Sequence, residues 1–261
     1  MTMRTVPNRV TVLGVPVAAL RLEELLAQVV ETIDGRTNGP LRIGYANAHV
    51  CNLAWNDAGF REALRCMDIV YADGNGPRVA AWFQGRALPG RMTGADWIHD
   101  LCEISIGRGC RMYFLGGEHG VAELAARRLT AAHPGLQVCG TQHGYLSQEH
   151  LSAIHETIRT LRPEILIVGM GSPRQEQWIV AHAGELGVPV VWGAGGMFDY
   201  ASGVARRPPK WMRDLALEWL GRMLLNPRRL AGRYLIGVPL FIARAIADGL
   251  SRRISGRSLL D

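Results

Sequence analysis

The chain has 261 residues, of which 48% are apolar, so it can form one large α/β domain or two small lobes and is not a disordered protein. Its five cysteines form no CxxC pair, which excludes the common zinc sites and disulfide frameworks and fits a reducing cytoplasm. Residues 1–9 hold no apolar stretch, so we expect no signal peptide.

Positive charge is concentrated at the C-terminal end. The net charge is +6, yet residues 206–261 carry 12 Arg and Lys against 4 Asp and Glu. The preceding residues are therefore close to neutral. A basic segment of this kind needs an acidic partner, such as an anionic lipid, a phosphate-bearing substrate or nucleic acid.

Hydrophobic patterning predicts strands that alternate with helices. In chain order we expect a strand pair at 10–17, a helix at 22–33, a strand at 41–46, a helix at 50–64, a strand at 69–72, and helices at 78–84 and 96–106. The second half predicts strands at 111–115, 136–141, 165–168 and 188–191, with helices at 121–132, 148–161 and 175–184. This order predicts an α/β fold with a Rossmann-like parallel sheet and helices on both faces.

Two parts of the chain are expected. Residues 1–205 would form the α/β core, in two lobes with a boundary near residue 108. Residues 206–261 would form a basic, amphipathic helical appendage that associates with a membrane.

One turn carries a lone carboxylate directly after an apolar run. The run 69–72 predicts a strand, and Asp73 follows it in a turn made by Gly74, Gly76 and Pro77. Glycine frees the backbone and proline ends strand pairing. The glycines also remove side chains from around Asp73, so a ligand can approach the backbone. The alternative is an ordinary turn with a solvated Asp.

Glycine-rich segments follow several of the predicted strands. They are the Asp73 turn, Gly116 with Gly117, the segment from Gly169 to Gly171, and the segment from Gly193 to Gly196. Parallel sheets bind ligands at the carboxyl ends of their strands, so these segments should lie on one rim. Backbone N–H groups at such turns suit a pyrophosphate, which predicts a nucleotide-like ligand.

Other cofactor motifs are weak or missing. Residues 114–120 resemble a loose dinucleotide-binding fingerprint, but the spacing is not GxGxxG and no acidic residue follows where an NAD ribose would need it. An NAD-dependent oxidoreductase therefore remains only an alternative. The chain has no Walker A motif and no DxD pair, and His155 and His182 lack the spacing of metal ligands, so we expect no metal.

The segment 171–176 has the features of a helix start. Ser172 can cap the helix, Pro173 fits its first turn, and Glu176 suits its positive end. A well-formed helix start explains these residues by itself. A functional interpretation uses the same N–H groups, with Gln175, to hold a phosphate or a sugar hydroxyl.

The C-terminal segment combines Trp and Arg with apolar residues at helical spacing. Asn226 and Pro227 predict the cap and first residue of a new helix, and Arg222, Arg229 and Arg233 would share a face if the helix continued through that point. We expect the apolar run 235–246 to be too short and interrupted to span a bilayer, and the segment to lie on a membrane. The alternative is a solvated basic helix pair, and no motif supports a nucleic-acid partner.

These motifs together resemble those of the WecG/TagA/CpsF family of bacterial glycosyltransferases. The resemblance covers residues 12–233. Its marks, in chain order, are Asn47, Asp73-Gly74-x-Gly76, Arg91-x-Thr93-Gly94-x-Asp96, Phe114-Leu115-Gly116-Gly117, Gly169-x-Gly171-x-Pro173-x-Gln175-Glu176, Gly195-Gly196-x-Phe198-Asp199, Arg207-x-Pro209-x-Trp211 and Glu218-Trp219-x-x-Arg222. So many motifs in one order argue against a chance match.

The resemblance implies an inverting transfer of a sugar from a UDP-sugar to a polyprenyl-diphosphate-linked sugar at the cytoplasmic membrane face. It implies that the reaction needs no metal and no cofactor. It also implies an α/β core with a C-terminal appendage that touches the membrane and closes the active site.

The resemblance further implies roles for residues at the matching positions. Asp73 would be the general base that deprotonates the acceptor hydroxyl, and Asn47 would orient the sugars nearby. The other implied substrate contacts are Arg91 and Gln175 to the donor or the departing phosphates, Asp199 to the ribose, Arg207, Arg222 and Arg229 to diphosphate, and the turns at Gly116, Gly117, Gly169, Gly171 and Ser172. Without a metal, arginines and helix N-termini would stabilise the leaving UDP.

Tyr45 departs from the family's teichoic-acid members, which carry Thr at that position. Tyrosine is larger and would change a sugar pocket, so N-acetylmannosamine and glucose both stay open as the sugar transferred. We expect a UDP-sugar-dependent hexosyltransferase of surface-polysaccharide synthesis, peripheral on the inner face of the cell membrane. A homo-oligomer stays open, and a nucleotide-dependent oxidoreductase or a non-catalytic membrane-binding module are the alternatives.

Overall fold

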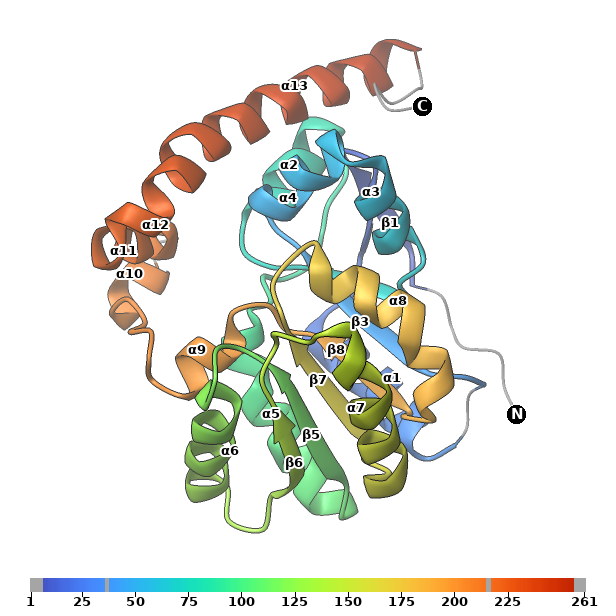
Figure 1. Cartoon of the computed structure of the whole chain (residues 1–261). Coiled ribbons are helices and arrows are strands. Elements are labelled where there is room, and N and C mark those ends of the chain that lie inside the picture. The colour runs from blue at the N-terminus through green and yellow to red at the C-terminus, as the bar shows by residue number, and fades with distance from the viewer. Residues whose placement is uncertain (1–6, 36–37, 215–216, 256–261) are drawn as a thin grey trace.

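A six-stranded parallel sheet forms the centre of the molecule (Figure 1). The computed structural model describes residues 7–35, 38–214 and 217–255. The strand order is β4-β3-β8-β7-β5-β6, with bounds β3 Leu41–Ala46, β4 Ile69–Ala72, β5 Arg111–Gly116, β6 Gln137–Gln142, β7 Ile165–Gly169 and β8 Val190–Gly193. A separate antiparallel pair comprises β1 (Arg9–Val12) and β2 (Val15–Ala18). The predicted Rossmann-like α/β fold is confirmed.

Helices cover both faces of the sheet and create two cores. One core packs against α1 (Leu22–Ile33), α5 (Gly94–Arg108), α6 (Val121–Ala132) and α9 (Met197–Ala201). The other packs against α2 (Ala48–Asn56), α3 (Ala58–Arg65), α4 (Gly76–Phe83), α7 (Gln148–Leu161) and α8 (Arg174–Leu186). Successive side chains of β7 alternate between them, Ile165 and Ile167 facing one core and Leu166 and Val168 the other. Burial on both faces explains why β4, β7 and β8 are continuous apolar runs, whereas the edge strand β6 is polar and only partly buried.

The two halves of the chain share this sheet. Strand β3 pairs with β4 on one side and with β8 on the other, with Leu41 opposite Val190. A lobe boundary near residue 108 stays a prediction.

The predicted helix at 50–64 is two helices, because Asp57 interrupts it. Asp57 adopts an extended conformation, and its side chain accepts a hydrogen bond from the Phe60 backbone N–H at 2.9 Å. Aspartate favours such N-terminal caps over helix interiors, so it ends α2 and begins α3.

The described elements of the C-terminal appendage are all helices. They are α10 (Lys210–Asp214), α11 (Glu218–Leu225), α12 (Pro227–Ala231), a π-helical turn η1 (Gly232–Ile236) and α13 (Gly237–Ser255). Asn226 separates α11 from α12, as predicted, because Pro227 begins the new helix there. Helix α13 then crosses α2 and α4 (Figure 1).

The expectation that this segment is too short and interrupted to span a bilayer is wrong. The helix from Gly232 to Ile254 runs through Pro239 and Arg244 without a break, and its 23 residues are long and apolar enough to cross a membrane by length and composition. Only 22% of the most apolar stretch of this helix is buried against the rest of the protein. A helix this exposed and apolar suits a lipid surface, either across it or along it.

Close-packed glycines hold the ends of β5 and β7 together. Gly116 has a φ of 152°, and a Cβ there would lie 2.4 Å from the Gly169 carbonyl oxygen. The Gly117 N–H donates to that oxygen at 2.9 Å. A Cβ on Gly169 would in turn lie 2.6 Å from the Phe198 ring. These positions therefore need glycine for packing.

The substitution Gly116→Ala should lower the free energy of unfolding by about 2–4 kcal/mol, because it adds both backbone strain and a clash with main-chain atoms. Urea unfolding followed by circular dichroism measures this. Gly184→Ala is the matched control: its Cβ meets nothing within 4 Å in helix α8, so it should be neutral or slightly stabilising. Equal stability of the two variants would contradict the packing role.

Candidate active site

Asp73 lies where strand β4 ends, and its backbone is fixed on both sides. The Asp73 N–H donates to the Ala46 carbonyl at 2.8 Å, and the Gly74 N–H donates to the Met92 carbonyl at 3.2 Å. Gly74 has a φ of 79°, a conformation that favours glycine. The strand end thus projects one carboxylate from a rigid turn.

Asn47 occupies the equivalent place after β3 and holds that carboxylate. Its Nδ2 donates to Asp73 Oδ2 at 3.1 Å, while its Oδ1 accepts from the Val50 N–H at 3.0 Å as the N-cap of α2. Because the amide oxygen is committed to the helix, its NH2 group must face Asp73. The sequence linked Asn47 and Asp73 only as parts of motifs shared with one family, whereas the structure shows that their side chains are in direct contact.

Burial raises the pKa of the Asp73 carboxyl above its ordinary value. The charge of Arg222 and the Asn47 hydrogen bond oppose this shift, as does the charge of Arg233, whereas Glu218 adds to it. A carboxylate with an elevated pKa is a better proton acceptor than an exposed one, which suits a general base.

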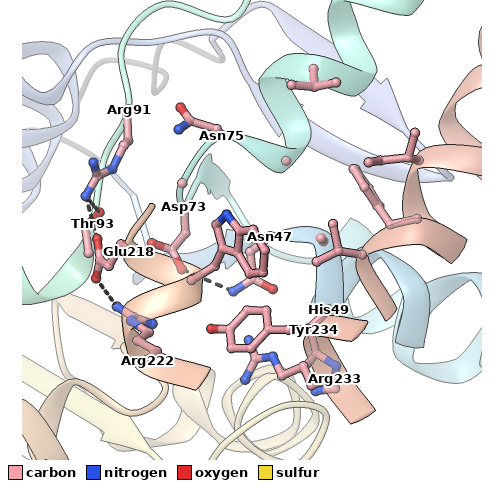
Figure 2. A pocket seen from close by; sticks show the side chains of 18 residues that line it. Asn47, His49, Asp73, Asn75, Arg91, Thr93, Glu218, Arg222, Arg233 and Tyr234 are labelled. Atoms are coloured by element: carbon pink, nitrogen blue, oxygen red, sulfur yellow. Dashed lines mark hydrogen bonds and ion pairs between the residues drawn. The ribbon is translucent and has the colours of Figure 1, made fainter. Parts of the chain in front are cut away.

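Glu218 joins the appendage to the core through two arginines (Figure 2). Its Oε2 accepts from Arg91 Nη2 at 2.7 Å, and its Oε1 accepts from Arg222 Nη2. The Arg222 guanidinium also lies 4.9 Å from the centre of the Tyr200 ring. Burial disfavours the Arg222 charge, but Tyr200, Glu218 and Asp73 together hold its pKa above the ordinary value, so it stays a cation.

Two cavities meet at Asp73. The residues that line both are Asn47, His49, Asp73, Thr93, Arg222, Arg233 and Tyr234. Burial lowers the pKa of His49 to about 4, helped by the nearby Arg233 charge, so its imidazole is neutral at physiological pH. The shared wall therefore contains one carboxylate, two guanidinium groups and neutral hydrogen-bonding groups.

The first cavity has a volume of about 290 Å³ and a largely apolar wall. Helices α11 and α13 and the start of α4 supply that wall through Trp219, Val238, Phe241, Ile242 and Val79. It leads from Asp73 along the appendage.

The second cavity has a volume of about 650 Å³ and lies over the carboxyl ends of β7 and β8. Its polar lining includes Gly171, Ser172, Asp199 and Tyr200. Tyr45 also lines it, and burial together with the charge of Glu176 raises the pKa of the Tyr45 hydroxyl, which therefore stays protonated.

A buried polar chain lies behind this second cavity. Ser172 Oγ lies 3.4 Å from the Tyr45 hydroxyl and donates to Glu176 Oε1 at 2.7 Å. The prediction that Ser172 caps the helix is therefore wrong. Gln175 Nε2 donates to the same oxygen, and its Oε1 accepts from the Gly195 N–H at 2.9 Å. Gln175 is fully buried and lines neither cavity, so its geometry fits the positioning of Ser172 and Gly195 rather than direct contact.

Several other predicted site residues lie outside the two cavities. Gly116, Gly117 and Gly169 pack against one another below the rim, as described above. Arg207 donates to Asp96 Oδ1 at 2.7 Å and connects the appendage to α5. The side chain of Arg229 lies outside the described part of the structure.

Sequence reasoning assigned no role to His49, Thr93, Tyr200, Glu218, Arg233 or Tyr234, which line or bridge the site. Thr93 and Glu218 belong to motifs quoted above, so a signal existed for these two. Arg233 was noted only as part of the basic C-terminal segment. His49, Tyr200 and Tyr234 had no signal, because their place depends on how the appendage folds back on the core.

One group of side chains away from these cavities could bind a metal. His155 on α7 and His182 and Glu185 on α8 have ligand atoms within 4.8 Å of one another, although their sequence spacing did not predict this. They line neither cavity. They are therefore no part of the candidate active site.

Comparison with known proteins shows the family to which this chain belongs. The family model of the glycosyl transferase WecG/TagA/CpsF family matches residues 10–255. Proteins of Staphylococcus aureus strains NCTC 8325, COL and MRSA252, each named N-acetylglucosaminyldiphosphoundecaprenol N-acetyl-beta-D-mannosaminyltransferase, are each 26% identical over 234 residues, 90% of this chain and 91% of theirs. The chain therefore belongs to the WecG/TagA/CpsF family and is a glycosyltransferase rather than an oxidoreductase or a non-catalytic module.

Proposed function

We propose that this glycosyltransferase moves a hexose from a UDP-sugar to a polyprenyl-diphosphate-linked sugar, with Asp73 as the general base. The observation that carries the proposal is the place of Asp73 between a polar cavity and an apolar one. A base at that junction can reach an acceptor hydroxyl from one side and face a donor on the other. The names of the relatives support a lipid-linked acceptor bearing N-acetylglucosamine and the transfer of N-acetylmannosamine.

The proposed reaction is a single displacement. The Asp73 carboxylate accepts the proton of the acceptor hydroxyl while the acceptor oxygen forms a bond to the anomeric carbon. The bond from that carbon to the UDP oxygen breaks, UDP leaves as an anion, and the configuration inverts. Asn47 orients the carboxylate throughout, because its amide is held by the start of α2.

The charge of the departing UDP requires stabilisation. Arg222 and Arg233 line both cavities, and Arg91 is aligned through Glu218. The starts of α2 and α4 abut beside Asp73, since a Cβ on Gly76 would lie 3.2 Å from the Ala48 nitrogen. Their positive ends and these guanidinium groups suit a diphosphate.

The polar cavity supports the donor assignment. Asp199 would bind the ribose hydroxyls, and Ser172 with the turn at Gly171 would bind the sugar or its phosphates. Tyr45 would narrow the sugar pocket and influence which hexose enters. The apolar cavity along α13 would receive the first isoprene units of the acceptor lipid.

The exposed apolar face of the appendage supports membrane association on the cytoplasmic side. Its most exposed apolar residues are Trp211, Leu224, Leu225, Leu235, Ile236, Leu250 and Ile254. Arg228 and Arg253, also exposed, accompany them. Apolar residues flanked by cations bind anionic lipid surfaces, and a polyprenyl acceptor is found only there.

Replacing Asp73 by Asn should lower transfer by about 10²–10⁴-fold while UDP binding is retained, because the carboxylate is lost but the shape is kept. Release of UDP from a panel of UDP-sugars, each with a lipid-linked acceptor, measures the rate. The wild-type rate should also fall on acidification at a pH above that of an ordinary aspartate, since burial raises the pKa of Asp73. Full activity of Asp73→Asn would contradict the role of base.

Replacing Glu218 by Gln should lower transfer roughly ten- to hundredfold, because charged hydrogen bonds to Arg91 and Arg222 are weakened. Steady-state kinetics with the same acceptor measures this. Glu62→Gln is the matched control, since Glu62 pairs with Arg65 at the surface, 3.6 Å away, and should leave the rate unchanged. The idea fails if both variants behave alike.

Replacing Ile236 by Glu should weaken binding to anionic vesicles several-fold, because Ile236 is 69% exposed on the apolar face of the appendage. Vesicle sedimentation measures the bound fraction. Gln177→Glu adds the same charge on an exposed position of α8 and should have little effect. If vesicle binding is unchanged in Ile236→Glu, this face does not contact the membrane.

A further inference from the structure

A third cavity lies far along α13 from the catalytic residues. Its volume is about 370 Å³, and it lies between β1, the loop after α4 and the last turns of α13. The residues that line it are Arg9, Val10, Thr11, Gln84, Arg86, Arg252 and Arg253. None of them lines either catalytic cavity.

The lining of this cavity is strongly positive. Four of its seven described residues are arginines, and no carboxylate is among them. Asp248, one turn before Arg252 on α13, accepts from Arg252 Nε at 3.0 Å, but it is fully buried and does not line the cavity. Four guanidinium groups around one cavity repel one another, so an anion bound among them would lower the energy of the assembly.

At least one guanidinium nitrogen at this cavity has no hydrogen-bond partner among the described residues. Arg252 Nη2 is buried and has no hydrogen-bond partner. Arg9 uses its Nη2 for the Asp68 carbonyl at 2.8 Å, and Arg253 uses its Nη2 for the Trp82 carbonyl at 3.5 Å. A buried donor without a protein partner is costly, so a ligand that accepts from it would be favoured.

We propose that this cavity binds a phosphate group. Phosphate oxygens match the planar fork of several guanidinium groups at once, and Thr11 and Gln84 add neutral polar atoms to the wall. The three chain segments that form the cavity are far apart in sequence, so a bound phosphate would fasten the end of the appendage to the core.

The surroundings of the cavity favour a phosphate carried by a lipid. Trp82, whose carbonyl accepts from Arg253, is 69% exposed. Ile254 and Leu250, which flank Arg252 and Arg253 on α13, are 85% and 53% exposed. A cationic cavity beside an exposed Trp and aliphatic side chains matches the phosphate level of a bilayer with its apolar layer next to it. The lipid source rests on the membrane association proposed above, whereas the phosphate site itself does not.

Calorimetric titration of the full-length protein with inorganic phosphate, at constant ionic strength set with chloride, tests the site. We expect saturable binding that is weakened roughly tenfold in Arg86→Gln, because one charged hydrogen bond is lost. Arg86 is exposed, so this variant should fold normally. Arg252→Gln should weaken binding as well, but it also removes the cation that pairs with the buried Asp248, so Arg252→Lys accompanies it as the variant that keeps the charge.

Arg127→Gln on α6 is the matched control, since Arg127 is exposed and its Glu123 partner is 3.9 Å away. It should bind phosphate like the wild type. If the wild type shows no saturable phosphate binding, or if Arg86→Gln and Arg127→Gln bind it equally well, the site does not exist.

Vesicles of phosphatidylcholine, with and without phosphatidylglycerol, separate the two sources of phosphate. A preference for phosphatidylglycerol that is reduced in Arg86→Gln but not in Arg127→Gln supports a lipid phosphate. An unchanged preference, with phosphate binding still weakened in Arg86→Gln, keeps the site but overturns the lipid source. UDP release with a water-soluble acceptor analogue should be unaffected in Arg86→Gln, so failure of this proposal is distinguishable from failure of the catalytic one.

Discussion

The register between β3 and β4 is the constraint on which the candidate active site depends. Ala46 lies opposite Ala72, so the residues that follow, Asn47 and Asp73, leave the sheet side by side. Parallel strands present their carboxyl ends on one rim, and a shift of one residue would send one of the two side chains to the other face. The hydrogen bond between them is therefore a consequence of the sheet.

Burial makes the charged form of the Asp73 carboxylate unfavourable, and cations of the appendage compensate for part of this cost. Without α11 and η1, Asp73 would lack Arg222 and Arg233, the two cations that lower its pKa. Glu218 would equally be missing from Arg91. The appendage and the core are thus electrostatically complementary, and the site is complete only when they are in contact. Two of the cations concentrated near the C-terminal end of the chain therefore act at Asp73.

The sequence predicted the sheet and most of its helices because strands buried on both faces and amphipathic helices leave strong periodic patterns. It missed the break at Asp57, where a single capping side chain outweighs an otherwise helical pattern. The strand-and-turn pattern singled out Asp73, but its implied role, and Asn47 itself, came from family motifs, since a turn with one carboxylate is not distinctive. The glycines Gly116 and Gly169 show the limit of motif reasoning: their packing needs glycine, so their motif alone does not indicate a ligand. The wall formed by Arg233 and Tyr234 depends on tertiary contacts that no local pattern encodes.

Helix α13 extends from the candidate active site to the arginine-lined cavity. It packs on α2 and α4, the two helices that begin beside Asp73. The Asn52 side chain on α2 donates to the Gly237 carbonyl at 2.7 Å, and Arg244 donates to Asn52 Oδ1 at 3.0 Å. One end of the helix thus meets the catalytic cavities, and the other meets the arginine-lined cavity beside Trp82. The proposed contact with a membrane along α13 would fix the height of Asp73 above the lipid phosphates, the level expected for the diphosphate of the proposed acceptor. With the membrane contact proposed above, α13 would also set the distance over which the acceptor hydroxyl must reach Asp73, the proposed base.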